Sequence, residues 1–233
     1  MNGASALIRT LAAAGVDVCF SNPGTSEMHF VAALDEVAEV RAVLGLFEGV
    51  VTGAADGYGR MTGRPAATLL HLGPGLGNGL ANLHNARRAR TPLLNIVGDH
   101  ATYHKQYDAP LESDIDTVAH NVSRWVRRSM SPADVARDAA DAIAAALGPP
   151  GEVATLILPA DVSWNDGASP APAPAAASPA TVAGDRVEAV AKALVSGEPA
   201  VILVGGSVVR DDAALRAVSR VARATGAKLL CET

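Results

Sequence analysis

The sequence is poor in aromatic residues and in cysteine. Phe, Trp and Tyr make up 3% of its 233 residues, so a core must be packed by the small and aliphatic residues within its 49% hydrophobic content. The two cysteines, Cys19 and Cys231, offer neither a metal-binding pattern nor a disulfide framework. No run reaches the roughly 18 apolar residues of a membrane span, and the N-terminus lacks a basic segment followed by an apolar one. We therefore expect a cytoplasmic protein with no metal site of its own and no membrane partner.

Signatures of nucleotide and nucleic-acid binding are also missing. The glycine-rich stretch at 73–79 fails the dinucleotide spacing Gly-x-Gly-x-x-Gly, because counting from Gly73 places Asn78 in the third slot and counting from Gly75 places Leu80 there. No Gly-x4-Gly-Lys-Ser/Thr segment occurs. The net charge is -5, and the arginines at 87, 88 and 90 and at 124, 127 and 128 are interpreted as solvated helix faces. We predict no nucleic-acid partner.

What is present is an alternation of helical and strand-like segments. Residues 4–14 have apolar positions at helical spacing and residues 16–21 form a short apolar strand. A helix at 26–38 then leads to an apolar run at 40–47, which predicts a strand buried on both faces. Such a βαβ connection is right-handed and makes the strands parallel, and ligands of open α/β sheets bind at the strands' carboxyl ends.

The same alternation continues along the chain. We expect strands at 67–72, 92–98, 125–126 and 153–158, helices at 81–90 and 132–147, and a glycine-rich loop at 73–79. The prediction is an α/β fold, a parallel sheet with helices on both faces.

The chain changes character near residue 165. Residues 165–184 are rich in Ala, Pro and Ser without a periodic apolar face, which is typical of an extended linker. We predict a first domain at 1–165, a linker at 166–183 and the beginning of a second α/β domain at 184–233. Two strands and two helices in the last segment provide too little core to be stable alone.

A single carboxylate, Glu48, stands where a predicted strand meets the start of a helix. An acid in the first turn of a helix usually complements the helix dipole, an effect of about 0.3–1 kcal/mol. Here Phe47, Val50 and Val51 surround it with apolar groups, which makes a Glu without a partner costly. Gly49 and the later glycines of this helix also let another backbone or a flat ring come close. We expect Glu48 to have a partner or a ligand.

Three segments together resemble a known family. Residues 44–63, Asn22-Pro23-Gly24-Thr25-Ser26-Glu27 and Gly73-Pro74-Gly75-Leu76-Gly77-Asn78 are similar to the pyrimidine-binding domain of thiamine diphosphate (ThDP) enzymes of the acetolactate synthase and benzoylformate decarboxylase group. The resemblance implies that Glu48 is catalytic, because the matching Glu bonds the aminopyrimidine ring of the cofactor and favours its imino tautomer. It also implies that the cofactor contacts Pro23, Gly24, Gly75 and Asn78. The family binds Mg2+ and the cofactor's diphosphate through a third domain with a Gly-Asp-Gly motif, which this sequence lacks.

The substrate end of the predicted site rests on a histidine and two hydroxyls. His71 matches a His of the benzoylformate decarboxylase branch, and Thr25 matches a Ser that faces the substrate there. We therefore predict that Thr25, Ser26 and His71 bind the substrate and that His71 is catalytic, although a lone His in an apolar strand is more often a packed structural group. Acetolactate synthases place a Gln where this chain has Leu111, which departs from a strict synthase pattern.

The resemblance implies an enzyme, a ThDP-dependent lyase or transferase that acts on a small 2-oxo acid. It covers about the first two fifths of a family member, so the chain alone is expected to be inactive. Because the family's sites lie between two chains, we expect a homo-oligomer, a dimer or a tetramer. The alternative is a non-catalytic or split subunit that uses the same surface only to dimerise or to bind a partner chain, with Glu48 merely capping its helix. The sequence leaves open which 2-oxo acid is consumed, and whether the enzyme is a decarboxylase, a synthase or an oxidase.

Overall fold

The computed structural model describes residues 1–232 and divides the chain into two compact units, Met1–Ser178 and a second unit that begins at Pro179. The first unit is built around six parallel strands in the order β2-β1-β3-β4-β6-β5. Their bounds are Val18–Asn22 (β1), Arg41–Leu44 (β2), Ala66–Leu70 (β3), Leu93–Asp99 (β4), Trp125–Arg128 (β5) and Val153–Pro159 (β6). This is the expected α/β fold with a parallel sheet.

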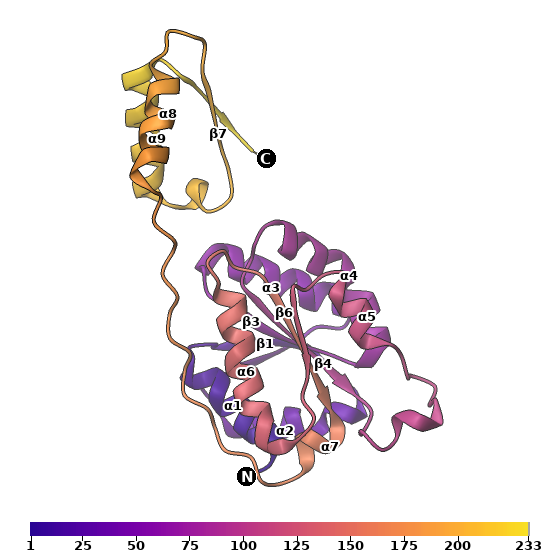
Figure 1. The fold of residues 1–233 in the computed structure, drawn as a ribbon. Coiled ribbons are helices and arrows are strands. Elements are labelled where there is room, and N and C mark those ends of the chain that lie inside the picture. Colours follow the sequence, from indigo (N-terminus) through magenta and orange to yellow (C-terminus); the bar gives the residue numbers. More distant parts are fainter. Residues whose placement is uncertain (233) are drawn as a thin grey trace. The chain divides into compact units, whose positions relative to one another are not determined.

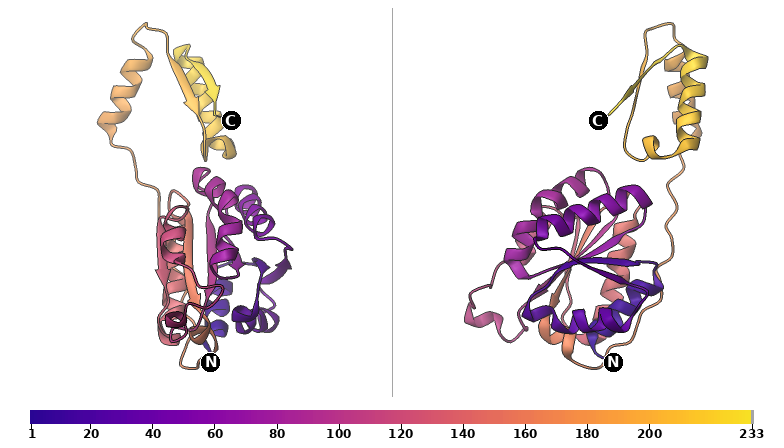
Figure 2. Two further views of the ribbon diagram at one scale, coloured as in Figure 1. Left: turned by 90° about the vertical axis from the view of Figure 1, so that its right-hand side faces the viewer. Right: turned by 180° about the vertical axis from the view of Figure 1, so that it is seen from behind.

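Helices cover both faces of this sheet (Figures 1 and 2). On one face lie α1 (Gly3–Ala13), α2 (Met28–Glu36), α6 (Pro132–Leu147) and α7 (Ala160–Trp164). On the other lie α3 (Glu48–Thr62), α4 (Leu72–Arg88) and α5 (Ile115–His120). Successive strand residues therefore enter different cores: Leu69 packs with the first group of helices and Leu70 with the second.

The central strands β3, β4 and β6 are buried along their whole length, as expected for a parallel sheet covered on both faces. The prediction for residues 40–47 was wrong in this respect. The strand there, β2, is four residues long and lies at the edge of the sheet, and Leu44 is 68% exposed. An apolar run alone does not say whether a strand is central, because strand order is set by tertiary packing.

The glycine-rich stretch at 73–79 is not a loop, so this prediction was also wrong. It forms the first two turns of α4, which begins directly after His71. Pro74 is tolerated there because the first turn of a helix has no partner for its backbone N–H groups. Gly79 is needed for close packing, since a Cβ at this position would lie 2.9 Å from the Thr52 methyl group on α3. Helix packing thus outweighs the low helix propensity of glycine.

Residues just after α7 are still part of the first unit and contact its N-terminal segment. Asp166 forms a bridge with Asn2, Ala168 N donates to Met1 O at 3.1 Å, and Ala171 N donates to Thr10 Oγ1 at 3.0 Å. These three residues of the predicted linker therefore contact α1 and the two residues before it. Residues 171–183 form neither helix nor strand.

The second unit contains α8 (Gly184–Leu194), β7 (Val201–Val204), α9 (Asp212–Thr225) and β8 (Lys228–Cys231). Its two strands pair in parallel, with Val201 opposite Lys228. Neither helix has a buried residue, so the apolar side of each lacks a core to pack against. None of the helices within residues 1–232 combines the length and hydropathy needed to cross a lipid bilayer.

Candidate functional site

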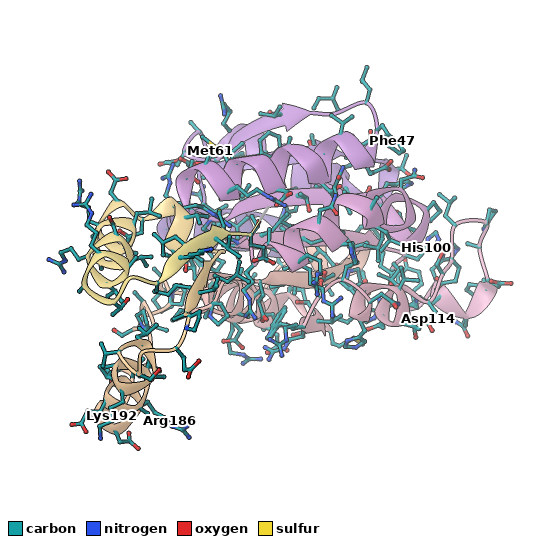
Figure 3. All side chains as sticks on the ribbon, turned by 90° about the horizontal axis from the view of Figure 1, so that it is seen from above. Phe47, Met61, His100, Asp114, Arg186 and Lys192 are labelled. Carbon is teal, nitrogen blue, oxygen red and sulfur yellow. The ribbon has the colours of Figure 1, made fainter. Side chains whose placement is uncertain are left out.

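The carboxyl ends of the strands bring several predicted site residues to one edge of the first unit. Glu48 follows β2 after a short connection, His71 follows β3 directly, and Pro23 follows β1. Figure 3 shows Phe47, the residue before Glu48, at the same end of the unit as His100, which follows β4, with Met61 at the other end of α3. The parallel sheet therefore gathers these segments from four different parts of the sequence.

Glu48 is the first residue of α3 and is buried, with 6% of its surface exposed. Asn78, in the second turn of α4, donates from Nδ2 to Glu48 Oε2 at 3.0 Å. The other oxygen, Oε1, faces Gly75, where an added Cβ would lie only 3.1 Å away. Among residues 1–232, Oε1 accepts no hydrogen bond. The structure thus brings Glu48, Gly75 and Asn78 together and leaves one carboxylate oxygen free to meet a ligand.

His71 lies against a second carboxylate, Glu27, at the same sheet edge. His71 Nδ1 is 2.7 Å from Glu27 Oε2, which also accepts the Gly24 N–H at 2.7 Å. The Glu27 side chain is 1% exposed and that of His71 is 24% exposed. Burial raises the pKa of Glu27 above its ordinary value, while the Gly24 N–H and His71 act in the opposite direction. His71 is thus oriented by a buried acid and keeps part of its ring accessible.

Two glycines make room for this pair. A Cβ on Gly24 would lie 2.3 Å from the His71 ring, and a Cβ on Gly98 would lie 1.7 Å from Glu27 Oε1. Glu27 Oε1 is buried and has no hydrogen-bond partner in the described part of the chain. Glu27 was named from the sequence only as the last residue of the segment 22–27 and was given no role in the site. Its position three residues after Gly24, a capping spacing, was the available signal.

Thr25 and Ser26, the hydroxyl residues predicted to face the substrate, directly precede Glu27 in the sequence but form no hydrogen bond with His71 in the described part of the chain. Thr25 and Ser26 belong to the short 3₁₀ helix Thr25–Glu27, where Thr25 is exposed and Ser26 is half-buried. Neither side chain hydrogen-bonds to His71 among residues 1–232. Pro23 and Gly24 are half-buried between β1 and this turn.

A network of charges at the end of β4 was not found from the sequence. Asp99 is fully buried and binds Lys105 Nζ at 3.1 Å, the guanidinium of Arg128 and the His100 N–H. Lys105 also pairs with Glu112. Lys105 therefore connects the loop after β4 to Asp99 at the end of that strand and to Glu112 further along the loop.

Arg128 completes the network by pairing with Asp116 at 2.5 Å. Burial lowers the pKa of Arg128, but hydrogen bonds to Asp116 and Asp99 raise it overall. Arg127 pairs with Asp138 at 2.9 Å. The prediction that these two arginines lie on a solvated helix face was wrong: both belong to strand β5 and pair with aspartates that lie far from them in the sequence.

The fold and the buried strand-end carboxylate define an α/β cofactor-binding domain, and comparison with known proteins identifies its class. Residues 1–120 match the family described as "Thiamine pyrophosphate enzyme, N-terminal TPP binding domain". This match covers more than half of the chain. The chain belongs to the thiamine pyrophosphate enzyme family, as the resemblance implied; thiamine pyrophosphate is ThDP.

Individual relatives agree with this family. The chain is 65% identical, over its whole length and 44% of the relative, to a Mycobacterium tuberculosis protein that carries the name of an acetolactate synthase large subunit, IlvX. It is 35% identical to benzoylformate decarboxylase of Pseudomonas aeruginosa, over 68% of this chain and 29% of that one. A ThDP-dependent 4-hydroxybenzoylformate decarboxylase from Rhodococcus jostii has a similar structure, with a TM-score of 0.87, 27% identity and coverage of 99% of this chain and 44% of that one. The chain spans less than half the length of these relatives.

Proposed function

We propose that the first unit is the pyrimidine-binding part of a ThDP-dependent enzyme that decarboxylates a 2-oxo acid or joins it to a second carbonyl compound. The observation that carries this proposal is the buried Glu48, with one oxygen held by Asn78 and the other beside Gly75. A carboxyl group in this position could donate its proton to an aminopyrimidine ring nitrogen and so favour the imino tautomer. Residues 1–165 would form this domain, 166–183 the linker and 184–233 the beginning of the central domain.

The cofactor would lie against Glu48, Gly75, Asn78, Pro23 and Gly24. The space beside Gly75 supports this, because a side chain there would crowd the free oxygen of Glu48. ThDP, when bound, supplies a nucleophilic thiazolium carbon and an electron sink for decarboxylation. Mg2+ and the cofactor's diphosphate would be held by residues outside this chain, since its sequence has no Gly-Asp-Gly motif.

The substrate would meet His71, Thr25 and Ser26. His71 suits the delivery and removal of protons because an imidazole has one nitrogen that can donate and one that can accept, and the contact with Glu27 fixes the direction of its ring. The identity to a benzoylformate decarboxylase favours an acid of the 2-oxo class. We propose a lyase or transferase for this reason.

An exposed apolar surface on β2 and α3 supports assembly into a homo-oligomer, a dimer or a tetramer, with a site shared between chains. The exposed large residues at the end of β2 and the start of α3 are Leu44, Leu46, Phe47 and Val50, of which Leu46 is 89% exposed. Such a patch marks an interaction surface in ordinary soluble proteins. The cytoplasmic location expected from the sequence stays a prediction.

The proposal is tested by replacing Glu48 in the full-length protein that contains this chain, supplied with ThDP, Mg2+ and a 2-oxo acid. Glu48→Gln preserves size and the bond to Asn78 but cannot transfer a proton to the ring nitrogen, so CO2 release should fall by about 10²-fold or more. Glu39→Gln removes an equal charge from an exposed position before β2 and should leave the rate unchanged. A parent protein without activity on any 2-oxo acid would instead support the non-catalytic subunit.

A further inference from the structure

A concavity of about 430 Å³ opens at the edge of the first unit's sheet opposite to Glu48 and His71. Four of its lining residues are arginines: Arg87, Arg88, Arg90 and Arg124. Arg90 stands shortly before β4, Arg124 directly before β5, and a further lining residue, Glu152, directly before β6. Because β4, β6 and β5 are neighbours in a parallel sheet, their amino ends bring these three residues to one place.

The backbone around Arg90 is held firmly by its surroundings. Arg90 adopts a left-handed conformation with φ 53°, which turns the chain sharply after α4, and its N–H donates to Arg87 O at 3.2 Å. Gly151 packs directly on this turn, since a Cβ there would lie 2.7 Å from Arg90 O. Leu93 N donates to Glu152 O at 3.1 Å. The connection before β6 therefore forms a fixed wall beside the arginines.

The four arginines lack the carboxylate partners that others in this unit have. Arg60, Arg64 and Arg127 each form a salt bridge with an aspartate. Within residues 1–232, none of the four lining arginines does so. Arg87 donates only to a backbone oxygen, that of Asn121 at 3.4 Å. These four arginines therefore line the concavity without a salt bridge, and Glu152 is the carboxylate that acts on Arg124 there.

Helix dipoles explain part of this charge but not all of it. Arg87 and Arg88 lie in the last turn of α4, where a cation complements the helix. Arg90 and Arg124 lie outside helices and have no such role. The ends of α4 and α6 together carry about one negative charge, and Glu152 adds another. About two positive charges therefore remain, in a chain whose net charge is -5.

We propose that this concavity binds a compact polyanion with adjacent phosphoryl groups, of the pyrophosphate or nucleoside diphosphate kind. The planar guanidinium group matches two phosphate oxygens at once, which gives arginine its preference for phosphate. Pro149, Pro150 and Ala144 also line the concavity, so apolar contacts are available to a ring attached to the phosphates. The site lies at the sheet edge away from Glu48 and does not depend on the proposed cofactor chemistry.

Inorganic pyrophosphate is the probe, titrated calorimetrically into the 233-residue chain. We expect binding of one pyrophosphate per chain that weakens as salt is added. The double variant Arg90→Asn/Arg124→Gln should weaken it by about tenfold or more. Asn is chosen at residue 90 because it tolerates a left-handed backbone. The control Arg9→Gln/Arg41→Gln removes two charges from exposed positions elsewhere and should bind as the parent does.

Three results would overturn the proposal. The first is a parent chain that binds no pyrophosphate. The second is equal weakening in both double variants, which would indicate attraction by net charge alone. The third is binding that Glu48→Gln abolishes and the arginine variant leaves intact, which would place the anion at the opposite edge. Circular dichroism checks that each variant is folded, and Arg88→Gln, an exposed helix position, replaces the double variant if that one is not.

Discussion

Glu27 and His71, 44 residues apart in the sequence, meet at 2.7 Å between Oε2 and Nδ1. The Glu27 side chain is 1% exposed and that of His71 is 24% exposed, so part of the imidazole ring stays accessible at the sheet edge. With Glu27 ionised, Nδ1–H donates to it and Nε2 is the acceptor of the neutral ring. A histidine arranged in this way can exchange protons with a substrate.

His71→Ala in the full-length enzyme should therefore slow turnover by about 10²-fold, the usual scale for a positioned acid or base. Because the side chain is partly exposed, the melting temperature should change little. Rate and melting temperature are measured on the same preparation. A reduced melting temperature with an unchanged rate per folded molecule would instead make His71 a packing residue.

The pKa of Glu27 gives the chain a pH-dependent stability. Burial raises this pKa in the folded state, so folding favours the protonated acid. That contribution is complete below about pH 4.5, the ordinary value for Glu, and is lost as the pH rises through the raised value. The slope is at most about 1.4 kcal/mol per pH unit for one proton.

Glu27→Gln isolates this effect, because the amide does not titrate and its oxygen can still accept the Gly24 N–H. Urea unfolding of both chains is followed between about pH 4.5 and 8. The free energy of unfolding of the parent, relative to the variant, should decrease as the pH rises. A relative stability that increases over this range would show that His71 outweighs burial and that the pKa of Glu27 is lowered.

Gly98 is expected to tolerate no side chain, because its Cβ would overlap Glu27 Oε1. Gly98→Ala should destabilise the first unit by about 1–3 kcal/mol, as overpacking of a buried position does. Gly57→Ala is the matched control: nothing lies within 4 Å of a Cβ there, and the change should stabilise α3 by about 0.5–1 kcal/mol. In a Glu27→Ala background the cost of Gly98→Ala should shrink, and full additivity would contradict the overlap.

The local part of the site could be predicted from the sequence, and the long-range part could not. The prediction that Glu48 stands at the start of a helix after a strand is confirmed. Such boundaries can be predicted because short apolar patterns in the sequence indicate where a strand ends and a helix begins. Its contact with Asn78 and the contact of His71 with Glu27 depend on how strands order themselves in the sheet. Cofactor and substrate roles for these residues stay predictions.

The errors have the same origin. The apolar run at 40–47 looked like a central strand, but its position at the edge leaves Leu44 exposed. The glycines after His71 looked like a loop, but packing against Glu48 and Thr52 makes them helical. The arginines at 124, 127 and 128 were interpreted as one cluster. In the structure Arg127 and Arg128 form salt bridges with aspartates, whereas Arg124 lines the concavity described above.

A ladder of buried polar side chains crosses the centre of the sheet. Thr68 Oγ1 donates to Asn95 Oδ1 at 2.8 Å, and Asn95 Nδ2 donates to Thr155 Oγ1 at 3.0 Å. All three residues are fully buried and stand opposite one another in the register of β3, β4 and β6. Asn95 is thus the only link between the two threonine hydroxyls among the described hydrogen bonds.

Asn95→Ala should lower the free energy of unfolding by about 1–3 kcal/mol, because it leaves the buried Thr68 hydroxyl without a partner, whereas Thr155 keeps its hydrogen bond with Ser123. The quadruple variant Thr68→Val/Asn95→Leu/Thr155→Val/Ser123→Ala removes the ladder together with the Ser123 hydroxyl that it reaches and should cost less. Urea unfolding is followed by tryptophan fluorescence, since Trp125 and Trp164 both lie in the first unit and report on it alone. If the quadruple variant costs as much as Asn95→Ala, packing rather than unsatisfied hydrogen bonding sets the penalty.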